Sequence, residues 1–202
     1  MTLRLVVATA NPDKAREIRA VLEAAGADVE LIPRPEDVPE VQETGTTLVE
    51  NARLKAEALR DATGMAAIGE DTGLEVDALG GAPGVRSARY AGDDATYADN
   101  VAKLLAEVDA VRRASRTARF RTSVVLALPD RRELVSEGVV EGVITHEARG
   151  TGGFGYDVVF APAGGGGRTF AELTPEQKHA ISHRGRALRA LALRLREAGS
   201  RP

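Results

Sequence analysis

Apolar residues recur along the chain with spacings that predict alternating strands and helices. Residues 3–9 form a Leu- and Val-rich run that predicts a buried strand. Apolar positions three and four apart predict a helix over residues 12–25, with Pro12 in its first turn and Gly26 at its end. A short strand is expected at residues 29–32. This strand–helix–strand opening is typical of α/β proteins.

The rest of the chain continues the same alternation. Capping signals predict a helix from Thr46 or Thr47 to about Ala62, and another beginning at Thr174. Further helices are expected over residues 96–108 and 185–198. Strands are expected at residues 66–68, 74–76, 118–128, 133–145 and 158–161, with the third and fourth forming a hairpin. Because no repeat or linker interrupts this pattern, we expect one α/β domain over residues 1–202.

The composition excludes several classes of protein. At a net charge of −3, the 202 residues offer no broad basic surface, so we expect no binding to nucleic acid or to anionic membranes. The absence of cysteine excludes disulfides, thiolate catalysis and cysteine metal sites. No window reaches the roughly 20 apolar residues of a membrane span, and the apolar run at residues 3–10 is too short for a signal peptide. We therefore expect a cytoplasmic protein.

Residues 9–14 lie at the predicted turn between the first strand and the first helix. The N-terminus of a helix offers unpaired N–H groups and a positive dipole end, both of which favour an anion. The sequence Thr9-Ala10-Asn11-Pro12-Asp13-Lys14 adds short polar side chains and a cation, so it predicts a phosphate site. A capped helix followed by a solvated lysine is the structural alternative.

Two polar residues fall on the inward stripe of the second helix. Spacings of three and four predict that the face meeting the core carries Leu48, Asn51, Ala52, Lys55, Ala58, Leu59 and Ala62. Asn51 and Lys55 thus lie on it one turn apart. A buried lysine is costly unless it meets a negative partner or its stem reaches along the helix to water, and both alternatives stay open.

Glu70 and Asp71 lie between Gly69 and Gly73, where the pattern indicates an acidic turn between two strand pieces. Carboxylates placed in this way suit Mg²⁺ and can orient or deprotonate an attacking water. A plain acidic turn would have the same sequence, so the residues alone leave the two interpretations equal.

The glycine-rich stretch at residues 150–157 contains the pattern G-x-G-x-x-G. A dinucleotide site needs a helix directly after these glycines, whereas residues 156–160 are expected to continue as strand, so that interpretation fails. A loop carrying Phe154 and Asp157 is instead suited to stacking on a base and holding a ribose. Near the C-terminus, the pair His183-Arg184 could read a purine carbonyl edge or complement a helix dipole.

Taken in order along the chain, these stretches resemble the inosine triphosphate pyrophosphatase family, which hydrolyses noncanonical purine nucleoside triphosphates. The matching segments cover nearly the whole chain: Glu43-Thr44-Gly45, Glu50-Asn51-Ala52 with Lys55, Asp71-Thr72-Gly73-Leu74, Gly80-Gly81-Ala82-Pro83-Gly84, Ser87-Ala88-Arg89-Tyr90, residues 150–157 and Ser182-His183-Arg184-Gly185. One departure concerns the acid pair, because Glu70 stands where the family usually has a first aspartate.

The resemblance implies a mixed α/β fold with a long central sheet, flanking helices and two lobes around a substrate cleft, in a homodimer. It also implies Mg²⁺-dependent attack of water at the α-phosphorus, with pyrophosphate leaving. Asp71 is then the catalytic base and a metal ligand, and Glu43 is the second metal ligand.

Further roles follow from the same motifs. The triphosphate is expected against residues 9–14 and Lys55. The remaining phosphate, the sugar and the base are expected at Thr72, Phe154, Gly155, Tyr156, Asp157, Lys178, His183 and Arg184. Three of the four lysines thus fall at positions where point charges would serve a polyphosphate.

Two rival functions stay open. A non-catalytic nucleotide-binding or sensing module would need the pocket but no base at Asp71. A related pyrophosphatase acting on other modified nucleotides would need the same machinery with a different base pocket.

Overall fold

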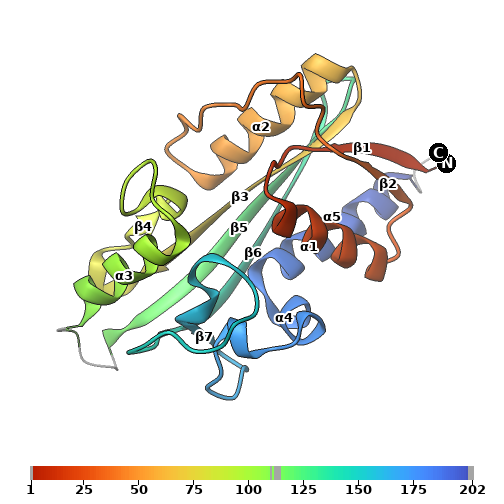
Figure 1. The fold of residues 1–202 in the computed structure, drawn as a ribbon. Coiled ribbons are helices and arrows are strands. Elements are labelled where there is room, and N and C mark those ends of the chain that lie inside the picture. Colours follow the sequence, from red (N-terminus) through yellow and green to blue (C-terminus); the bar gives the residue numbers. More distant parts are fainter. Residues whose placement is uncertain (1, 110, 112–114, 200–202) are drawn as a thin grey trace. The chain divides into compact units, whose positions relative to one another are not determined.

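The computed structural model describes residues 2–109, 111 and 115–199. Helices and strands follow one another as β1 (Leu3–Val7), α1 (Pro12–Ala24), β2 (Val29–Ile32), α2 (Leu48–Thr63), β3 (Ala66–Val76), β4 (Pro83–Gly84), α3 (Tyr97–Val108), β5 (Thr117–Ala127), β6 (Glu133–Ile144), β7 (Phe160–Pro162), α4 (Pro175–Ile181) and α5 (His183–Gly199) (Figure 1). Short 3₁₀ helices at Asp77–Leu79, Ser87–Arg89, Gly155–Val158 and Phe170–Glu172 connect some of them. None of the described helices is long and apolar enough to cross a membrane.

Among the described residues, the strands form one seven-stranded sheet in the order β2-β1-β3-β5-β6-β7, with β4 beside β3. β1 runs parallel to both β2 and β3, whereas β4 is antiparallel to β3 and β7 is antiparallel to β6. A tight turn joins β5 to β6, in which the N–H of Leu128 donates to the carbonyl oxygen of Arg132 at 2.9 Å. The predicted mixed α/β fold with a long sheet and flanking helices is confirmed.

The chain divides into two compact units. Of the described residues, those within Met1–Asp71, Thr122–Gly138 and Arg184–Pro202 form the first unit, and those within Thr72–Arg121 and Val139–His183 form the second. The long strands β3, β5 and β6 contribute residues to both. The boundary in β3 falls directly after Asp71.

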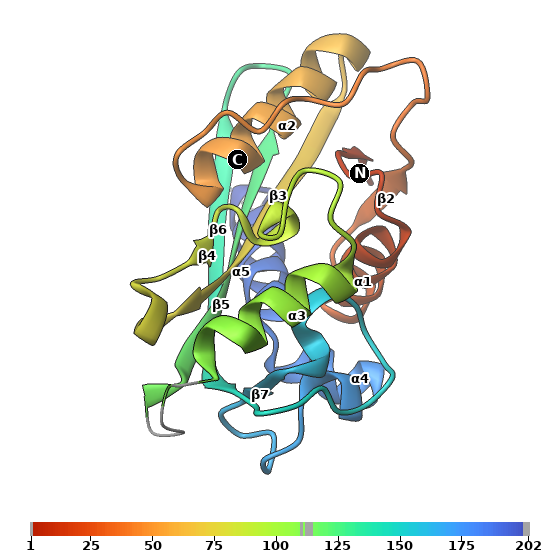
Figure 2. The same cartoon turned by 60° about the vertical axis from the view of Figure 1, so that its left-hand side comes forward.

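The first unit has a core on each side of its strands, because alternate residues of a strand face opposite sides of a sheet. On one side, strand residues pack with α1 and α5: Leu5, Val7, Ala66, Ile68, Val124 and Leu126 with Ile18, Leu22, Leu188 and Leu191. On the other side, the intervening residues pack with α2: Val6, Ala67, Val125 and Ala127 with Ala52, Ala56 and Leu59. In the part of β3 that belongs to the first unit, residues 66–71, even-numbered residues therefore face α1 and α5, and odd-numbered residues face α2. The helix α2 lies on one side of these strands, and α1 and α5 lie on the other (Figures 1 and 2).

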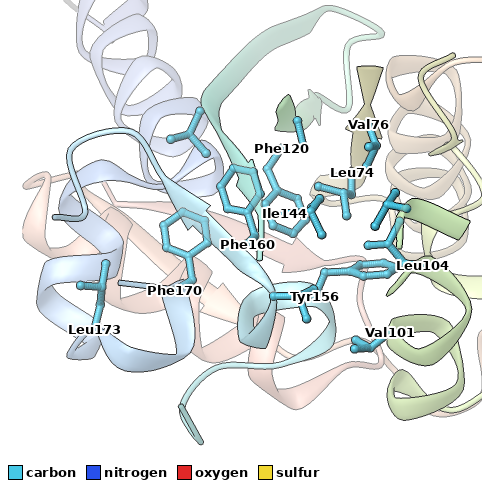
Figure 3. Close-up of a cluster of buried hydrophobic side chains, with 14 residues drawn as sticks. Leu74, Val76, Val101, Leu104, Phe120, Ile144, Tyr156, Phe160, Phe170 and Leu173 are labelled. Carbon is cyan, nitrogen blue, oxygen red and sulfur yellow. The ribbon is translucent and has the colours of Figure 1, made fainter. Parts of the chain in front are cut away.

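The second unit is built around an aromatic core (Figure 3). The Phe120 ring meets the Phe160 ring edge-on with centroids 4.8 Å apart, and the Phe160 ring lies 5.4 Å from that of Phe170. Edge-on and tilted ring pairs of this kind add attraction beyond the burial of apolar area. Leu104 of α3 and Ile144 of β6 complete the packing.

Two expectations about local structure are wrong. The predicted acidic turn between two strand pieces is one continuous strand, β3, in which Gly69 serves packing rather than a turn. A Cβ at Gly69 would lie 2.1 Å from the carbonyl oxygen of Ala52, so glycine lets α2 approach the strand closely. The strand expected from residue 156 begins only at Phe160, after the 3₁₀ helix Gly155–Val158. That single short turn is still not the α-helix that a dinucleotide motif requires.

Candidate active site

The turn between β1 and α1 has the predicted form of a capped helix start. Asn11 is the N-cap, and its Oδ1 accepts hydrogen bonds from the N–H groups of Asp13 (2.9 Å) and Lys14 (3.2 Å). The N–H of Asn11 donates to Thr9 Oγ1 at 3.1 Å, which fixes the approach from β1. Pro12 occupies the first helical position, where no N–H is needed.

The same turn borders a cavity of about 310 Å³ in the first unit. Thr9 and Ala10 line it at the carboxyl end of β1, together with Arg19 of α1 and Arg34. The carboxyl ends of parallel strands are where open α/β sheets bind their ligands. Of the predicted phosphate-binding turn, Thr9 and Ala10 therefore lie on the wall of this cavity, whereas Asn11, Pro12, Asp13 and Lys14 do not.

The two adjacent acids on β3 point to opposite faces of the sheet and have different partners. Glu70, an even-numbered residue, meets Arg184 at the start of α5. Asp71, an odd-numbered residue, faces α2, where Lys55 donates to its Oδ1 at 3.0 Å and Asn51 donates to its Oδ2 at 3.3 Å. The two carboxylates thus cannot act as one pair, and Asp71 alone is on the side of the predicted ligand Glu43.

Lys55 lies between the two predicted metal ligands. Its Nζ donates to Glu43 Oε1 at 2.9 Å and to Asp71 Oδ1 at 3.0 Å, and the three side chains are mostly buried. Burial would lower the pKa of Lys55, but the charges of Asp71 and Glu43 outweigh it and raise that pKa. Burial raises the pKa of Asp71, although the Lys55 charge opposes the rise. Of the two alternatives that the sequence left open for Lys55, the structure shows the negative partners, Glu43 and Asp71.

The two carboxylates around Lys55 fit a hard cation that takes most of its ligands from water and substrate. One carboxylate oxygen of Glu43 and one of Asp71 both contact the Lys55 ammonium, so the two carboxylates are directed at the same position. Within the described residues, no group of three or more acidic or histidine side chains could hold a metal ion. Mg²⁺ binds through one or two carboxylates and fills its octahedron with water and phosphate oxygens, so it suits this arrangement.

Glu70 anchors a buried ion-pair network in the first unit. Arg184 donates through Nε to Glu70 Oε2 at 2.6 Å and through Nη2 to Glu70 Oε1 at 2.8 Å, and its Nη1 also donates to Glu17 of α1. Lys14 Nζ lies 3.5 Å from Glu70 Oε1. Burial would raise the pKa of Glu70, but the charges of Arg184 and Lys14 outweigh it and lower that pKa to about 2.

Arg184 is the cation at the centre of this network. Its side chain is only 2% exposed, and it donates hydrogen bonds to Glu70 and Glu17. The structure thus supports a role for Arg184 in holding Glu70, while its contact with a purine base stays a prediction.

Apart from Arg184, the predicted base and sugar residues belong to the second unit. Lys178 Nζ donates to Asp157 Oδ2 at 2.7 Å, and both side chains are about 95% buried or more. The Phe154 N–H donates to the same oxygen at 2.8 Å, and the ammonium lies 4.9 Å from the centre of the Phe154 ring. Asp157 therefore closes the loop around Gly155, whose φ of 60° favours glycine.

Two other predicted substrate residues belong to the core of the second unit. Tyr156 is buried and donates its hydroxyl to the carbonyl oxygen of Ser87 at 3.0 Å, which supports a packing role. The His183 ring stacks on Phe120 with centroids 4.5 Å apart. Thr72, directly after Asp71 on β3, is half-buried.

Glu17 is a site residue that the sequence did not indicate. It lies one turn after Lys14 on α1, and its partner Arg184 is 167 residues away in the chain. A single acidic residue on the polar face of a helix does not indicate, in the sequence, a partner so far along the chain.

The sequence profile of the Ham1 family matches residues 5–193. This chain belongs to the Ham1 family. Among its relatives in that family, the dITP/XTP pyrophosphatase of Streptomyces coelicolor is 48% identical over 96% of this chain and 98% of its own length. The dITP/XTP pyrophosphatase of Geobacillus kaustophilus is 49% identical over 93% and 91%.

Solved structures of Ham1 proteins have the same fold. The HAM1 protein from Coxiella burnetii superposes with a TM-score of 0.86 at 41% identity, covering 96% of this chain and 99% of its own. The nucleoside-triphosphatase, or dITP/XTP pyrophosphatase, from Mycobacterium abscessus gives 0.72 at 46% identity, covering 94% and 97%. The family predicted from the sequence motifs is confirmed.

Proposed function

We propose that this protein hydrolyses noncanonical purine nucleoside triphosphates, those of inosine, deoxyinosine and xanthosine, to the monophosphate and pyrophosphate, and so cleans the nucleotide pool. The observation that carries the proposal is the buried Asp71 carboxylate, held by two donors from α2 beside a second carboxylate, Glu43. The relatives named dITP/XTP pyrophosphatase over nearly the full length support the same activity.

Glu43 and Asp71 would hold a Mg²⁺ ion. When bound, such an ion would supply positive charge that neutralises the phosphate oxygens and Lewis acidity toward the reacting phosphate. The raised pKa of Asp71 suits a general base, because a base works best when its pKa approaches the operating pH. Asp71 would accept the proton of the attacking water at its carboxylate.

Lys14, Lys55 and the N-terminus of α1 would bind the polyphosphate. Phosphoryl transfer needs mostly positioning and charge neutralisation, so these cations suffice without a covalent nucleophile. Burial, which the Glu70 charge only partly offsets, lowers the pKa of Lys14. Glu70 keeps a negative charge beside this lysine and favours its ammonium form.

We propose that the remaining phosphate, the sugar and the base bind at Thr72, Phe154, Gly155, Tyr156, Asp157, Lys178, His183 and Arg184. A hydrogen-bond donor facing the purine 6-position would donate to the keto oxygen of hypoxanthine or xanthine and oppose the amino group of adenine. A desolvated clash of two donors costs roughly 1–3 kcal/mol, which is a tenfold to hundredfold discrimination. Comparable hydrolysis of adenosine and inosine triphosphates would contradict this proposal.

The test is pyrophosphate release from inosine, xanthosine, guanosine, adenosine and cytidine triphosphates, each with Mg²⁺ and with a chelator. Metal-dependent release that favours inosine and xanthosine is expected. Asp71→Asn should abolish release and retain nucleotide binding. Wild-type protein that binds these nucleotides and hydrolyses none would instead favour the non-catalytic module.

The resemblance to the pyrophosphatase family also motivates two proposals about the protein in the cell. We propose a homodimer, which light scattering on a size-exclusion column would detect, and a cytoplasmic location, which cell fractionation would test. A monomer at every accessible concentration would contradict the first, and a membrane or secreted fraction would contradict the second.

A further inference from the structure

Asn51 is a fully buried amide that contacts two parts of the candidate site. Its Oδ1 accepts a hydrogen bond from the Gly45 N–H at 2.8 Å, and its Nδ2 donates to Asp71 Oδ2 at 3.3 Å. Asn51 lies on α2, one turn before Lys55, which donates to the other oxygen of the same carboxylate. Two donors one turn apart on one helix therefore hold both oxygens of Asp71.

The orientation of the Asn51 amide follows from its partners. A backbone N–H can only donate, so the amide oxygen must face Gly45 and the NH₂ group must face Asp71. A carboxylate can only accept when it is ionised, which agrees with that orientation. Because the amide is buried, leaving either of its ends without a partner would cost free energy.

Gly45 follows Glu43 by two residues, so the same amide also fixes the segment that carries the second carboxylate. The approach is close: a Cβ at Gly45 would lie 2.6 Å from Asn51 Oδ1 and 2.7 Å from Glu50 Cβ. The Glu43 segment therefore rests on the start of α2 through a contact that admits no side chain.

We propose that Asn51 is a positioning residue that ties the Glu43 segment to Asp71 and thereby sets the placement of the two carboxylates for catalysis. The inference rests on the proposed function, since it assigns Asn51 a share in that reaction. Both hydrogen bonds of the Asn51 side chain act on the candidate metal ligands, one on Asp71 itself and the other on Gly45 in the segment that carries Glu43. The effect of Asn51 should therefore appear in kcat and leave the KM for nucleotide nearly unchanged.

Asn51→Asp separates the two contacts of the amide. The aspartate retains an oxygen that can accept from the Gly45 N–H, but it places a second carboxylate oxygen against Asp71. Loss of a side chain that orients a metal ligand typically lowers activity by about 10–100-fold. We expect N51D to lower kcat for inosine triphosphate by that factor, with little change in KM. Asn51→Ala, which removes both contacts without adding charge, should also lower kcat and serves if N51D does not fold.

Asn100 provides a matched control. It is also buried, and it also uses both ends of its amide, accepting from the Ala91 N–H at 2.7 Å and donating to the Ala88 carbonyl oxygen at 3.0 Å. Both Asn100→Asp and N51D should lower the thermal midpoint of unfolding, but Asn100→Asp should retain the wild-type kcat. Calorimetry of nucleotide binding with a chelator present adds a readout without metal, in which N51D should match the wild type.

The results of these experiments separate the role of Asn51 from the proposed function itself. A fall in kcat for N51D and N51A, with unchanged KM and a normal kcat for N100D, supports the role of Asn51. A wild-type kcat in either Asn51 variant, or an equal fall in N100D, overturns it. Wild-type protein that releases no pyrophosphate from any nucleotide would instead count against the proposed function.

Discussion

Glu70→Gln should remove a large part of the acid sensitivity of folding in this protein. The Glu70 side chain is 2% exposed and accepts two hydrogen bonds from Arg184, at 2.6 and 2.8 Å. Burial would raise its pKa, but the charges of Arg184 and Lys14 lower that pKa from 4.5 to about 2. The folded state therefore binds this carboxylate's proton much more weakly than the unfolded chain does.

The sign and the size of the effect follow from this difference. A carboxyl group whose pKa is depressed by folding stabilises the folded state above its unfolded pKa, and that stabilisation is lost as the pH falls through the folded pKa. At 1.36 kcal/mol for each pH unit between 4.5 and about 2, ionised Glu70 contributes about 3 kcal/mol to the free energy of unfolding at pH 7. At pH 3 about 1 kcal/mol of it remains, so about 2 kcal/mol is lost between these pH values.

The assay is urea unfolding of wild type and E70Q followed by circular dichroism at several pH values from 7 to 3. The difference in unfolding free energy between the two proteins should shrink by about 2 kcal/mol over this range. Glu30→Gln removes an exposed carboxylate paired with Arg4 and is the control, with a change of about 1 kcal/mol or less at every pH. A difference between wild type and E70Q that stays constant with pH would refute the reasoning.

Three further predictions concern other parts of the protein. Lys55→Met removes a charge that lowers the pKa of Asp71, so that pKa should rise further. Because the base works when ionised, the acid limb of the kcat/KM profile should move to higher pH. A pH–rate profile would measure this shift, and the surface variant Lys103→Met is the control that should show none. Lys178→Met leaves the buried Asp157 carboxylate without its ammonium partner and should lower the free energy of unfolding, measured with urea, by about 3–5 kcal/mol. A loss below about 1 kcal/mol would show that this ion pair stabilises the fold little. Gly69→Ala places a Cβ 2.1 Å from the Ala52 carbonyl oxygen and should destabilise the protein by roughly 1–3 kcal/mol and lower kcat; unchanged unfolding and kcat would show that α2 can move away freely.

Local signals predicted the helices well because capping is chemistry between near neighbours. Thr47 and Glu50 form the predicted capping box at the start of α2, and Thr174 with Gln177 does the same for α4. Asn11 caps α1 and Pro12 begins it, as expected. In such motifs the donor and the acceptor lie within three residues of each other, so the sequence shows both.

The inward face of α2 was predicted less accurately. Asn51 and Lys55 lie toward the core as the spacing required, but Ala62 is exposed and Ala56 is buried instead. The buried stripe depends on how the helix crosses the strands, and the close approach at Gly69 sets that crossing. A helical spacing rule contains no information on the packing partner.

The arrangement of the acids could not be predicted from the sequence because it depends on distant residues. The continuity of β3 through Glu70 and Asp71 separates the two carboxylates onto opposite faces, whereas the flanking glycines suggested a turn. Glu70 then meets Arg184, 114 residues later, and Glu17 joins the same guanidinium. Each partner is an ordinary charged residue in its own helix, so only the folded chain identifies the network.

The most direct test of the proposed reaction is hydrolysis of inosine triphosphate with Mg²⁺ in ¹⁸O-labelled water, with both products analysed by mass spectrometry. If Asp71 directs water to the α-phosphorus, the label should appear in inosine monophosphate, and the pyrophosphate should be unlabelled. Label in pyrophosphate, or release of orthophosphate in place of pyrophosphate, would contradict the account.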